Sequence, residues 1–143
     1  MYRKILVALN LTDDDWNVLD HVRRLAGHFE SEVVLLHVAD GWAARNFDQL
    51  KLAESEEMRE DRQALDQIAD RLRSEGLNIT VLLAMGSPPE QILKVVAQAG
   101  CDLIAMTTHG HRFLGDLIHG STIAEVRHRT SIPVLLVRAR SDN

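Results

Sequence analysis

Five short apolar runs, separated from one another by polar stretches with helical spacing, constrain the fold of this chain most strongly. The runs cover 5–9, 33–38, 79–84, 103–106 and 134–137. They are rich in Val, Ile and Leu and lack the polar–apolar alternation of a half-exposed strand. Continuous apolar strands of this length are typical of parallel sheets that helices cover on both faces. The pattern therefore predicts an α/β fold with a parallel sheet in the middle.

The polar stretches between the runs carry signals for helix starts and stops. Amphipathic helical spacing of apolar residues is found in four stretches: 12–29, 53–74, 87–99 and 121–129. Thr12 and Asp15 resemble a capping box, and Gly76 is placed to end the second helix. Ser87 is expected to cap the third helix, with a proline following it. The segment 39–52 is less periodic and is expected to be a loop with some helical turn.

Alternating strands and helices leave few possible topologies, because crossovers between parallel strands are right-handed. These rules favour a doubly wound, five-stranded parallel sheet of order 3-2-1-4-5, with helices on both faces. The first and fourth strands are then neighbours, and the winding reverses between them. Ligands bind sheets of this kind in the crevice at that reversal. The length of 143 residues predicts a single domain spanning 1–143.

Composition excludes several classes of function. A net charge of −5 argues against a general nucleic-acid binder, which normally carries a basic face. Cys101 is the only cysteine, so no intramolecular disulfide can form, and the expected location is the cytoplasm. The apolar runs are far shorter than the roughly 20 residues of a membrane-spanning helix, and the N-terminal run is too short for a secretory signal. No membrane partner is therefore expected.

The stretch 108–122, THGHRFLGDLIHGST, follows the fourth strand and lies over the predicted crevice. Gly110 and Gly120 allow close approach of the backbone to a ligand, and Ser121 and Thr122 stand at the start of a helix. Free N–H groups and the dipole at a helix start favour a phosphate. The alternative is purely structural: Gly120 ends a turn, and Ser121 or Thr122 caps the helix.

Two other chemistries are compatible with the same stretch. His109, His111 and His119 could supply imidazole ligands to a transition metal, but the only nearby acid is Asp116. A Mg²⁺ ion carried by a nucleotide fits better, since phosphates and water hold most of its coordination sites. The acids at 13–15 could serve that ion, although acids are also common in the first turn of a helix.

A catalytic signature is also present in part. Residues 108–111, THGH, match the [HT]-x-G-H signature of a nucleotidyltransferase superfamily. That signature lies after the first strand of its own fold, whereas here it follows the fourth strand. The context therefore argues against this reading, and the role of the three histidines stays open.

Taken together, these segments resemble the universal stress protein family over nearly the full length. The resemblance rests on YRKILVALN, LLHV, GSPPEQI, DLIAMTTHG and HGSTIAEVRHRTSIPVLLV. The nucleotide-binding branch carries G-x2-G-x9-G-[ST], and the matching positions here are Thr107, Gly110, Gly120 and Ser121. Thr107 replaces the first glycine of that motif, and its Cβ could crowd a phosphate or ribose. Asn10 stands where the family usually has aspartate, and Leu11 where it often has glycine.

The resemblance implies ATP as ligand, with Mg²⁺ as a possible companion and at most slow hydrolysis, since no side chain is an evident base. It implies a set of nucleotide contacts: Ala8, Asn10, Val38, Met106, Thr107, Gly110, Gly120, Ser121, Thr122 and Ile123. A homodimer is expected through the apolar last strand, Val134, Leu135, Leu136 and Val137, which lies at the sheet edge. Two functions remain open: a nucleotide-binding, dimeric regulator of a stress response, and a protein-interaction module of the same fold that binds no nucleotide. The partner protein is unknown in both.

Overall fold

The computed structural model describes residues 1–40, 47–109 and 120–140, with the side chains of 40, 47–55 and 120 left undescribed. Five strands form its sheet: β1 (Lys4–Ala8), β2 (Glu32–Asp40), β3 (Asn78–Gly86), β4 (Leu103–Thr108) and β5 (Val134–Arg138). Four helices accompany them: α1 (Asp15–Phe29), α3 (Phe47–Ser74), α4 (Pro88–Ala99) and α5 (Gly120–Arg129). The strands are parallel and lie in the order β3-β2-β1-β4-β5, which confirms the predicted topology.

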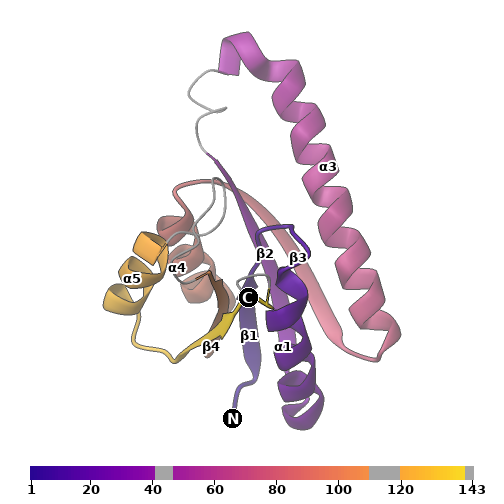
Figure 1. Cartoon of the computed structure of the whole chain (residues 1–143), viewed down its shortest axis with the longest axis vertical. Coiled ribbons are helices and arrows are strands. Elements are labelled where there is room, and N and C mark those ends of the chain that lie inside the picture. The colour runs from indigo at the N-terminus through magenta and orange to yellow at the C-terminus, as the bar shows by residue number, and fades with distance from the viewer. Residues whose placement is uncertain (41–46, 110–119, 141–143) are drawn as a thin grey trace.

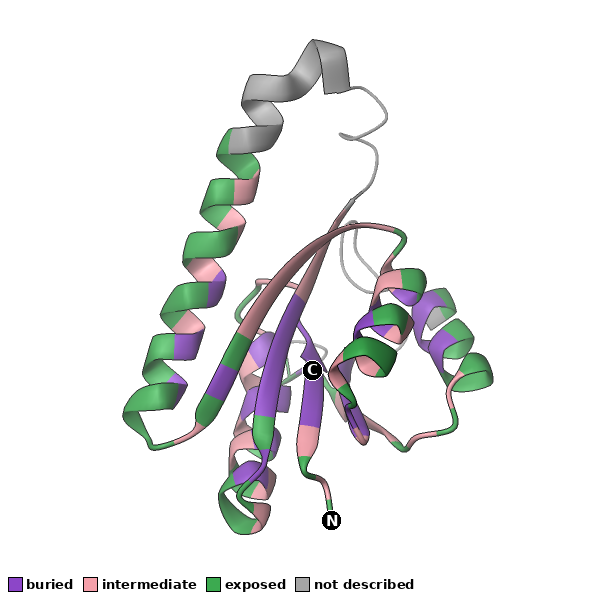
Figure 2. Ribbon diagram, turned by 180° about the vertical axis from the view of Figure 1, so that it is seen from behind, coloured by how far each residue is buried: buried purple, intermediate pink, exposed green. Residues whose placement is uncertain are grey.

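Helices cover both faces of the sheet and enclose two apolar clusters (Figure 1). One cluster joins α1 and α3 to the sheet through Leu19, Leu65 and other residues. The second joins α4 and α5 to the opposite face through Ile92, Val126 and others. Purple buried segments run through the middle of the strands in Figure 2, between the two helical layers. Residues 5–9 are all at most 2% exposed, as expected for a central strand covered on both sides.

The helix α3 begins earlier than the sequence pattern indicated. It starts at Phe47 and not near Ala53, so most of the segment 39–52 is helix or strand and not loop. The reason is local: residues 47–74 contain neither glycine nor proline, so nothing interrupts the helix. Among the described side chains of α3, Leu65 and Leu72 in its C-terminal half are buried.

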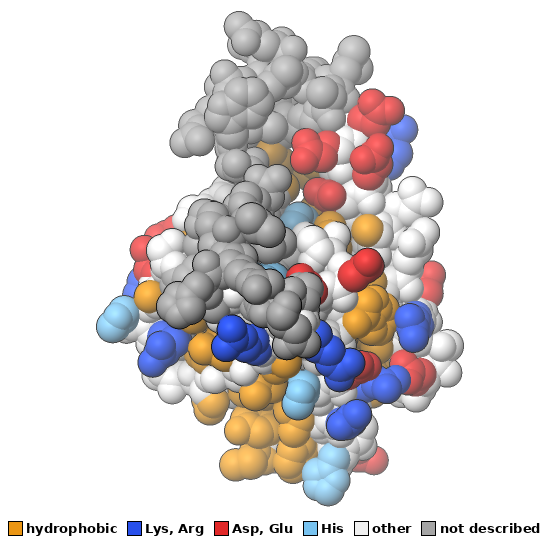
Figure 3. Space-filling model, in the orientation of Figure 1, with side chains coloured by type: hydrophobic (Ala, Val, Ile, Leu, Met, Phe, Trp, Pro, Cys, Tyr) orange, Lys and Arg blue, Asp and Glu red, His pale blue; other side chains and the backbone are white. Residues whose placement is uncertain are grey.

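The described outer part of α3 is strongly acidic. Figure 3 shows acidic side chains gathered along the described stretch of α3 that adjoins 47–55, and the sequence places Glu56, Glu57, Glu60 and Asp61 there. Glu56, Glu57 and Glu60 are exposed. This part of the helix extends past the carboxyl end of the sheet (Figure 1). The charged side chains of this part face water, whereas the C-terminal half of α3 packs against β2 and β3.

The helix ends follow the predicted chemistry in most cases. Gly76 adopts a φ of 91° two residues after α3 ends, and its N–H bonds to the Arg73 carbonyl. Gly100 caps α4 with a φ of 74°. Ser87 precedes Pro88 at the start of α4 as expected, but its side chain makes no capping hydrogen bond. Within the described residues, no helix combines the length and the apolar character that crossing a membrane requires.

Candidate functional site

The crevice predicted from topology lies where β1 and β4 end side by side. Ala8, the last residue of β1, is in register with Met106 of β4. From β1 the sheet continues to β2, and from β4 it continues to β5, so the connections leave in opposite directions at this point. The carboxyl ends of these two strands therefore form the switch point at which such sheets bind ligands.

Four of the predicted contact residues lie together on the face that α4 and α5 cover. Ala8, Met106 and Ile123 are buried in the same apolar cluster, and Val38 packs against it partly buried. Ala8, Val38 and Met106 lie toward the carboxyl ends of their strands, and Ile123 lies in the first turn of α5. Their side chains belong to the apolar layer between the sheet and the helices α4 and α5. The structure thus brings these residues together, and it assigns their side chains to packing.

The start of α5 belongs to the same face. The helix begins at Gly120, one residue before the earliest predicted start, so Ser121 and Thr122 lie in its first turn and do not cap it from outside. Ser121 is exposed, while Thr122 is 6% exposed. The first N–H groups of a helix have no partner within the helix, so this end of α5 retains the donor geometry that a phosphate needs. Gly110, His111, Asp116 and His119 lie outside the described residues.

Thr107 lies on the opposite face of the sheet. It is fully buried and shares the side of β4 that carries Ala105, which packs in the cluster with α1 and α3. Neighbouring residues of a strand point to opposite faces, so the Thr107 side chain points away from the layer that holds α5. The crowding expected from its Cβ is therefore not directed toward the start of α5.

A buried carboxylate organises the loop between β1 and α1. Asp15 is fully buried, and its carboxylate accepts N–H groups from three successive residues. The distances are 3.0 Å from Asn10, 2.7 Å from Leu11 and 3.3 Å from Thr12. Leu11 has a φ of 63°, in the left-handed region that favours glycine. The family glycine at this position therefore matches a conformation that this chain adopts with leucine.

Only one of the two hydrogen bonds of the predicted capping box is formed. The Asp15 carboxylate accepts the Thr12 N–H, as the box requires, but α1 begins at Asp15 and Asp14 takes the capping position without a side-chain cap bond. Sequence reasoning placed all three acids in a first helical turn and missed the specific role of Asp15. The only feature of the sequence that pointed to this role of Asp15 was its spacing of three residues from Thr12.

The ionisation of Asp15 is under two opposing influences. Burial raises the pKa of its carboxyl above the usual value, and the three N–H bonds and the nearby His37 act to lower it. The net direction is upward, because removing a carboxylate from water is costly even where hydrogen bonds compensate.

Two histidines flank the end of β1, each near an acid from a helix. His37 on β2 lies with Nδ1 2.8 Å from the Leu9 carbonyl and Nε2 3.7 Å from Asp61 of α3. The His37 ring is thus partly buried and is placed between a backbone carbonyl and an acid of α3. His109, one residue past β4, is 6% exposed, and its Nδ1 lies 3.9 Å from Asp14.

Two buried polar atoms near the end of β4 make no hydrogen bond within the described part of the chain. They are the Thr107 hydroxyl and His109 Nε2. Thr107 and His109 are two residues apart along the extended chain, so they lie on the same side of the sheet, beneath α1. A buried polar group without a partner is uncommon in folded proteins, and neither of these two could be recognised from the sequence pattern.

No metal centre is formed by the described residues. Across 1–40, 47–109 and 120–140, no group of three His, Cys, Asp or Glu side chains is arranged to hold an ion. Asp15 directs both carboxylate oxygens to backbone N–H groups, which leaves it unavailable as a ligand.

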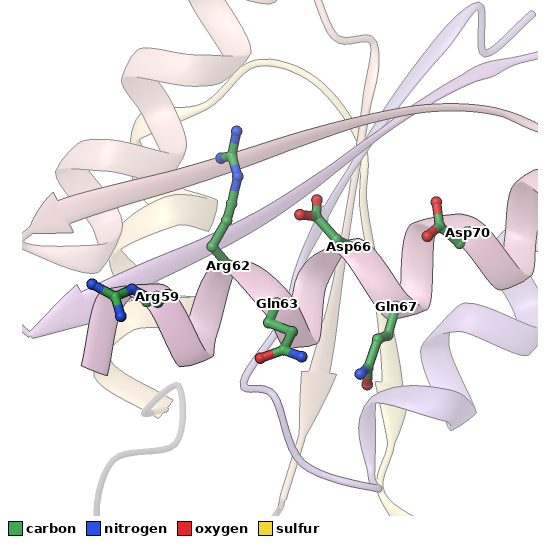
Figure 4. A pocket seen from close by; sticks show the side chains of 6 residues that line it. All are labelled: Arg59, Arg62, Gln63, Asp66, Gln67 and Asp70. Carbon is green, nitrogen blue, oxygen red and sulfur yellow. The ribbon is translucent and has the colours of Figure 1, made fainter. Parts of the chain in front are cut away.

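A shallow depression of about 460 Å³ lies on the solvent side of α3, away from the strand ends. All of the side chains that line it belong to α3: Arg59, Arg62, Gln63, Asp66, Gln67 and Asp70. Figure 4 shows that they spread to both sides of the helix and do not converge on a common point. A ligand site needs convergent polar groups in a concave setting, so this surface is not the functional site.

The strand order, the reversal between β1 and β4 and the helix start at Gly120 define a doubly wound α/β protein, a class whose members bind ligands at the carboxyl ends of the strands. Comparison with known families agrees with this class. The model of the universal stress protein family matches residues 1–138. The chain belongs to the universal stress protein family.

Individual relatives support the assignment over the full chain. The universal stress protein MJ0577 of Methanocaldococcus jannaschii is 25% identical over 158 residues, covering 99% of this chain and 98% of the relative. A solved structure of MJ0577 matches with a TM-score of 0.81 and 27% identity over 98% of both chains.

Two further solved structures share the fold and hold nucleotides. The universal stress protein of Archaeoglobus fulgidus, in complex with dAMP, has a TM-score of 0.71 and 22% identity, covering 95% of this chain and 98% of that one. A universal stress protein in complex with cAMP has a TM-score of 0.68 and 17% identity, covering 96% and 97%.

Proposed function

We propose that this protein binds ATP in the crevice between the ends of β1 and β4 and acts as a dimeric regulator in a stress response. The observation that carries the proposal is the topological switch point at the carboxyl ends of β1 and β4, together with the helix start at Gly120 in the segment that follows β4. The dAMP and cAMP complexes of proteins with the same fold support an adenine nucleotide as ligand class.

The proposed arrangement divides the nucleotide between two elements. The nucleoside end lies at Asn10 and at the backbone of Val38 and Met106, and the phosphates lie at the first turn of α5, near Gly120 and Ser121. The Asn10 amide offers one acceptor and two donors in place of the carboxylate usual in the family. Gly110 completes the phosphate loop in this proposal. A Mg²⁺ ion would be held mainly by the phosphates, since the described residues offer no three-ligand site.

Substitutions at the start of α5 test the phosphate site. Gly120→Val is expected to abolish ATP binding in calorimetry by blocking approach to the backbone. Ser121→Ala is expected to weaken binding by about 1 kcal/mol, the worth of one hydroxyl contact. His111→Ala serves as the control and is expected to leave affinity nearly unchanged. Equal affinity of Gly120→Val and the unaltered protein would show that the phosphates bind elsewhere.

The alternative function is an interaction module of the same fold that binds no nucleotide. Three departures from the family pattern favour it: Asn10, Leu11 and Thr107. Mass spectrometry of small molecules released from the purified, denatured protein distinguishes the two functions. Released adenine nucleotide supports the first, whereas its absence, together with no heat of ATP binding, supports the interaction module.

A further inference from the structure

The loop that joins β1 to α1 contains three consecutive N–H groups that all donate to one side chain. The strand β1 ends at Ala8, so the amides of Asn10, Leu11 and Thr12 have left the sheet. Successive N–H groups in a turn of this kind form a concavity that binds anions. Here the anion is supplied by the chain itself, as the carboxylate of Asp15.

The conformation of the loop depends on that carboxylate. Leu11 is in the left-handed region with a φ of 63°, where a residue with a Cβ is disfavoured. Its N–H makes the shortest of the three bonds, at 2.7 Å. Without an acceptor at this point, three buried or half-buried amides would lose their partners and Leu11 would be free to return to a more favourable conformation.

The hydrogen bonds to Asp15 also determine the position of Asn10. Its N–H bonds to Asp15 Oδ1, while the N–H groups of the next two residues bond to Oδ2. The backbone on both sides of the Asn10 side chain is thereby fixed at the edge of the crevice. We infer that Asp15 is a positioning residue of the nucleotide site, which holds the loop 10–12 so that Asn10 faces the nucleoside. The inference rests on the proposed function and adds to it a residue that does not touch the ligand.

Other ionisable groups surround Asp15 within the described residues. Asp14 precedes it at the N-cap of α1, and His109 after β4 lies 3.9 Å from Asp14. On the other side, His37 of β2 favours the charged form of Asp15, and Asp61 of α3 lies 3.7 Å from His37. The pH dependence of ligand binding therefore has to be compared between the unaltered protein and a variant that removes the Asp15 carboxylate alone. The contributions of the other groups cancel in that comparison.

The experiment compares ATP affinity of the full chain with that of Asp15→Asn by calorimetry. The asparagine amide can accept N–H groups on one side only, and its NH₂ group opposes the rest. If the loop then spends about a tenth of its time in the binding conformation, ATP affinity falls about tenfold. Asp13→Asn is the matched control, since it removes an exposed acid two residues away, and its affinity is expected to stay within about twofold.

Two further readouts separate positioning from a general loss of stability. Hydrogen exchange is expected to accelerate at the amides of 10–12 in Asp15→Asn, while the amides of β1 and β4 keep their protection. ATP affinity of the unaltered protein is expected to fall as pH is lowered through the titration of Asp15, and the Asp15→Asn profile is expected to lack that step. If Asp15→Asn does not fold, the pH profile and the exchange of 10–12 in the unaltered protein decide the question.

Each outcome has a separate meaning. Absence of ATP binding by the unaltered protein overturns the proposed function. Binding by the unaltered protein, with equal affinity and an equal pH profile in Asp15→Asn, overturns only the inference about Asp15. If that variant does not fold, an ATP affinity of the folded unaltered protein that shows no step through the titration of Asp15 also overturns it.

Discussion

A fully buried carboxylate such as Asp15 is unusual, because removing a charge from water is unfavourable unless hydrogen bonds replace the solvent. In this protein three backbone N–H groups replace it, and they belong to the loop that the carboxylate organises. The desolvation of one residue is thus coupled to the conformation of three others. This coupling has a measurable consequence for stability.

Stability is expected to depend on the protonation of Asp15 with a sign opposite to that of most acids. Burial raises the pKa of Asp15 in the folded protein above the 3.8 of an ordinary aspartate. Between these two values the folded state binds more protons than the unfolded state, so the free energy of unfolding from this group falls as pH rises. The contribution is fully present below 3.8 and is lost as pH rises through the folded pKa.

Urea unfolding at a series of pH values measures this effect. The free energy of unfolding of the unaltered protein, minus that of Asp15→Asn, is expected to decrease with rising pH above 3.8. The corresponding difference for Asp13→Asn is expected to stay nearly constant. A difference that increases with pH for Asp15→Asn would mean that the N–H bonds outweigh burial and that the folded pKa is low.

Cys101 is expected to be unreactive in the folded protein. Burial raises the pKa of its thiol from 9.0 to about 11, with Lys4 acting in the opposite direction. The fraction of reactive thiolate near neutral pH is then about a hundredfold lower than for a free thiol. Alkylation by iodoacetamide, followed by intact mass, is expected to be slower by at least that factor in native buffer than in urea. Similar rates in the two solutions would show an exposed thiol.

At the site, the sequence predicted positions better than side-chain directions. The residues 120–122 indicated the start of α5 to within one residue, because glycine and hydroxyl residues at a helix start carry a recognisable signal. The burial of Thr107 on the far face could not be deduced, since it depends on which helix covers which side of β4. The role of Asp15 also requires the three-dimensional path of the loop, because its partners are backbone groups and leave no trace in side-chain patterns.

At the scale of elements, the junction between α1 and β2 contains a correctable strain. Glu30 caps α1 with a φ of 56°, its N–H bonds to the Ala26 carbonyl, and its side chain is exposed. Glycine adopts this conformation without the clash of a Cβ. Glu30→Gly is therefore expected to stabilise the protein by about 0.5–1 kcal/mol, or roughly 2–4 °C in Tm for 1 kcal/mol.

Glu30→Ala is the control for that prediction. Alanine removes the same carboxylate but keeps the Cβ, so the left-handed strain remains and no gain is expected. Both variants can be measured by thermal unfolding at the same protein concentration. Equal Tm values for Glu30→Gly and Glu30→Ala would show that the strain at this cap is relieved in some other way.

The elements themselves could be predicted from sequence, whereas several of their ends could not. Continuous apolar runs identified all five strands. The reason is clearest for β1 and β4, which are buried almost throughout and therefore need apolar residues at every position. The start of α3 at Phe47 escaped recognition because the sequence of its first turns shows no regular apolar spacing, so it resembles loop residues in composition. The start of α5 was also missed by one residue, because glycine commonly precedes a helix, whereas Gly120 is the first residue of α5.

At the scale of the whole molecule, β5 forms one edge of the sheet and raises the question of assembly. It pairs with β4 on one side and with no described strand on the other. Leu136 is 38% exposed, and Val134, Leu135 and Val137 are only half-buried. An apolar edge strand with unpaired N–H and C=O groups is a surface that proteins normally protect by pairing. We therefore propose that β5 of one protomer pairs with β5 of its partner.

Light scattering tests this assembly at micromolar concentration. The unaltered protein is expected to have twice the chain mass of 16.1 kDa. Leu136→Lys is expected to shift it toward the monomer, because a charged side chain on an edge strand opposes pairing and the exposed position leaves the protomer core intact. Gln67→Lys adds the same charge on the exposed face of α3 and is expected to leave the mass unchanged. A monomeric unaltered protein would exclude the dimer, and a Leu136→Lys variant that remains fully dimeric would place the interface elsewhere.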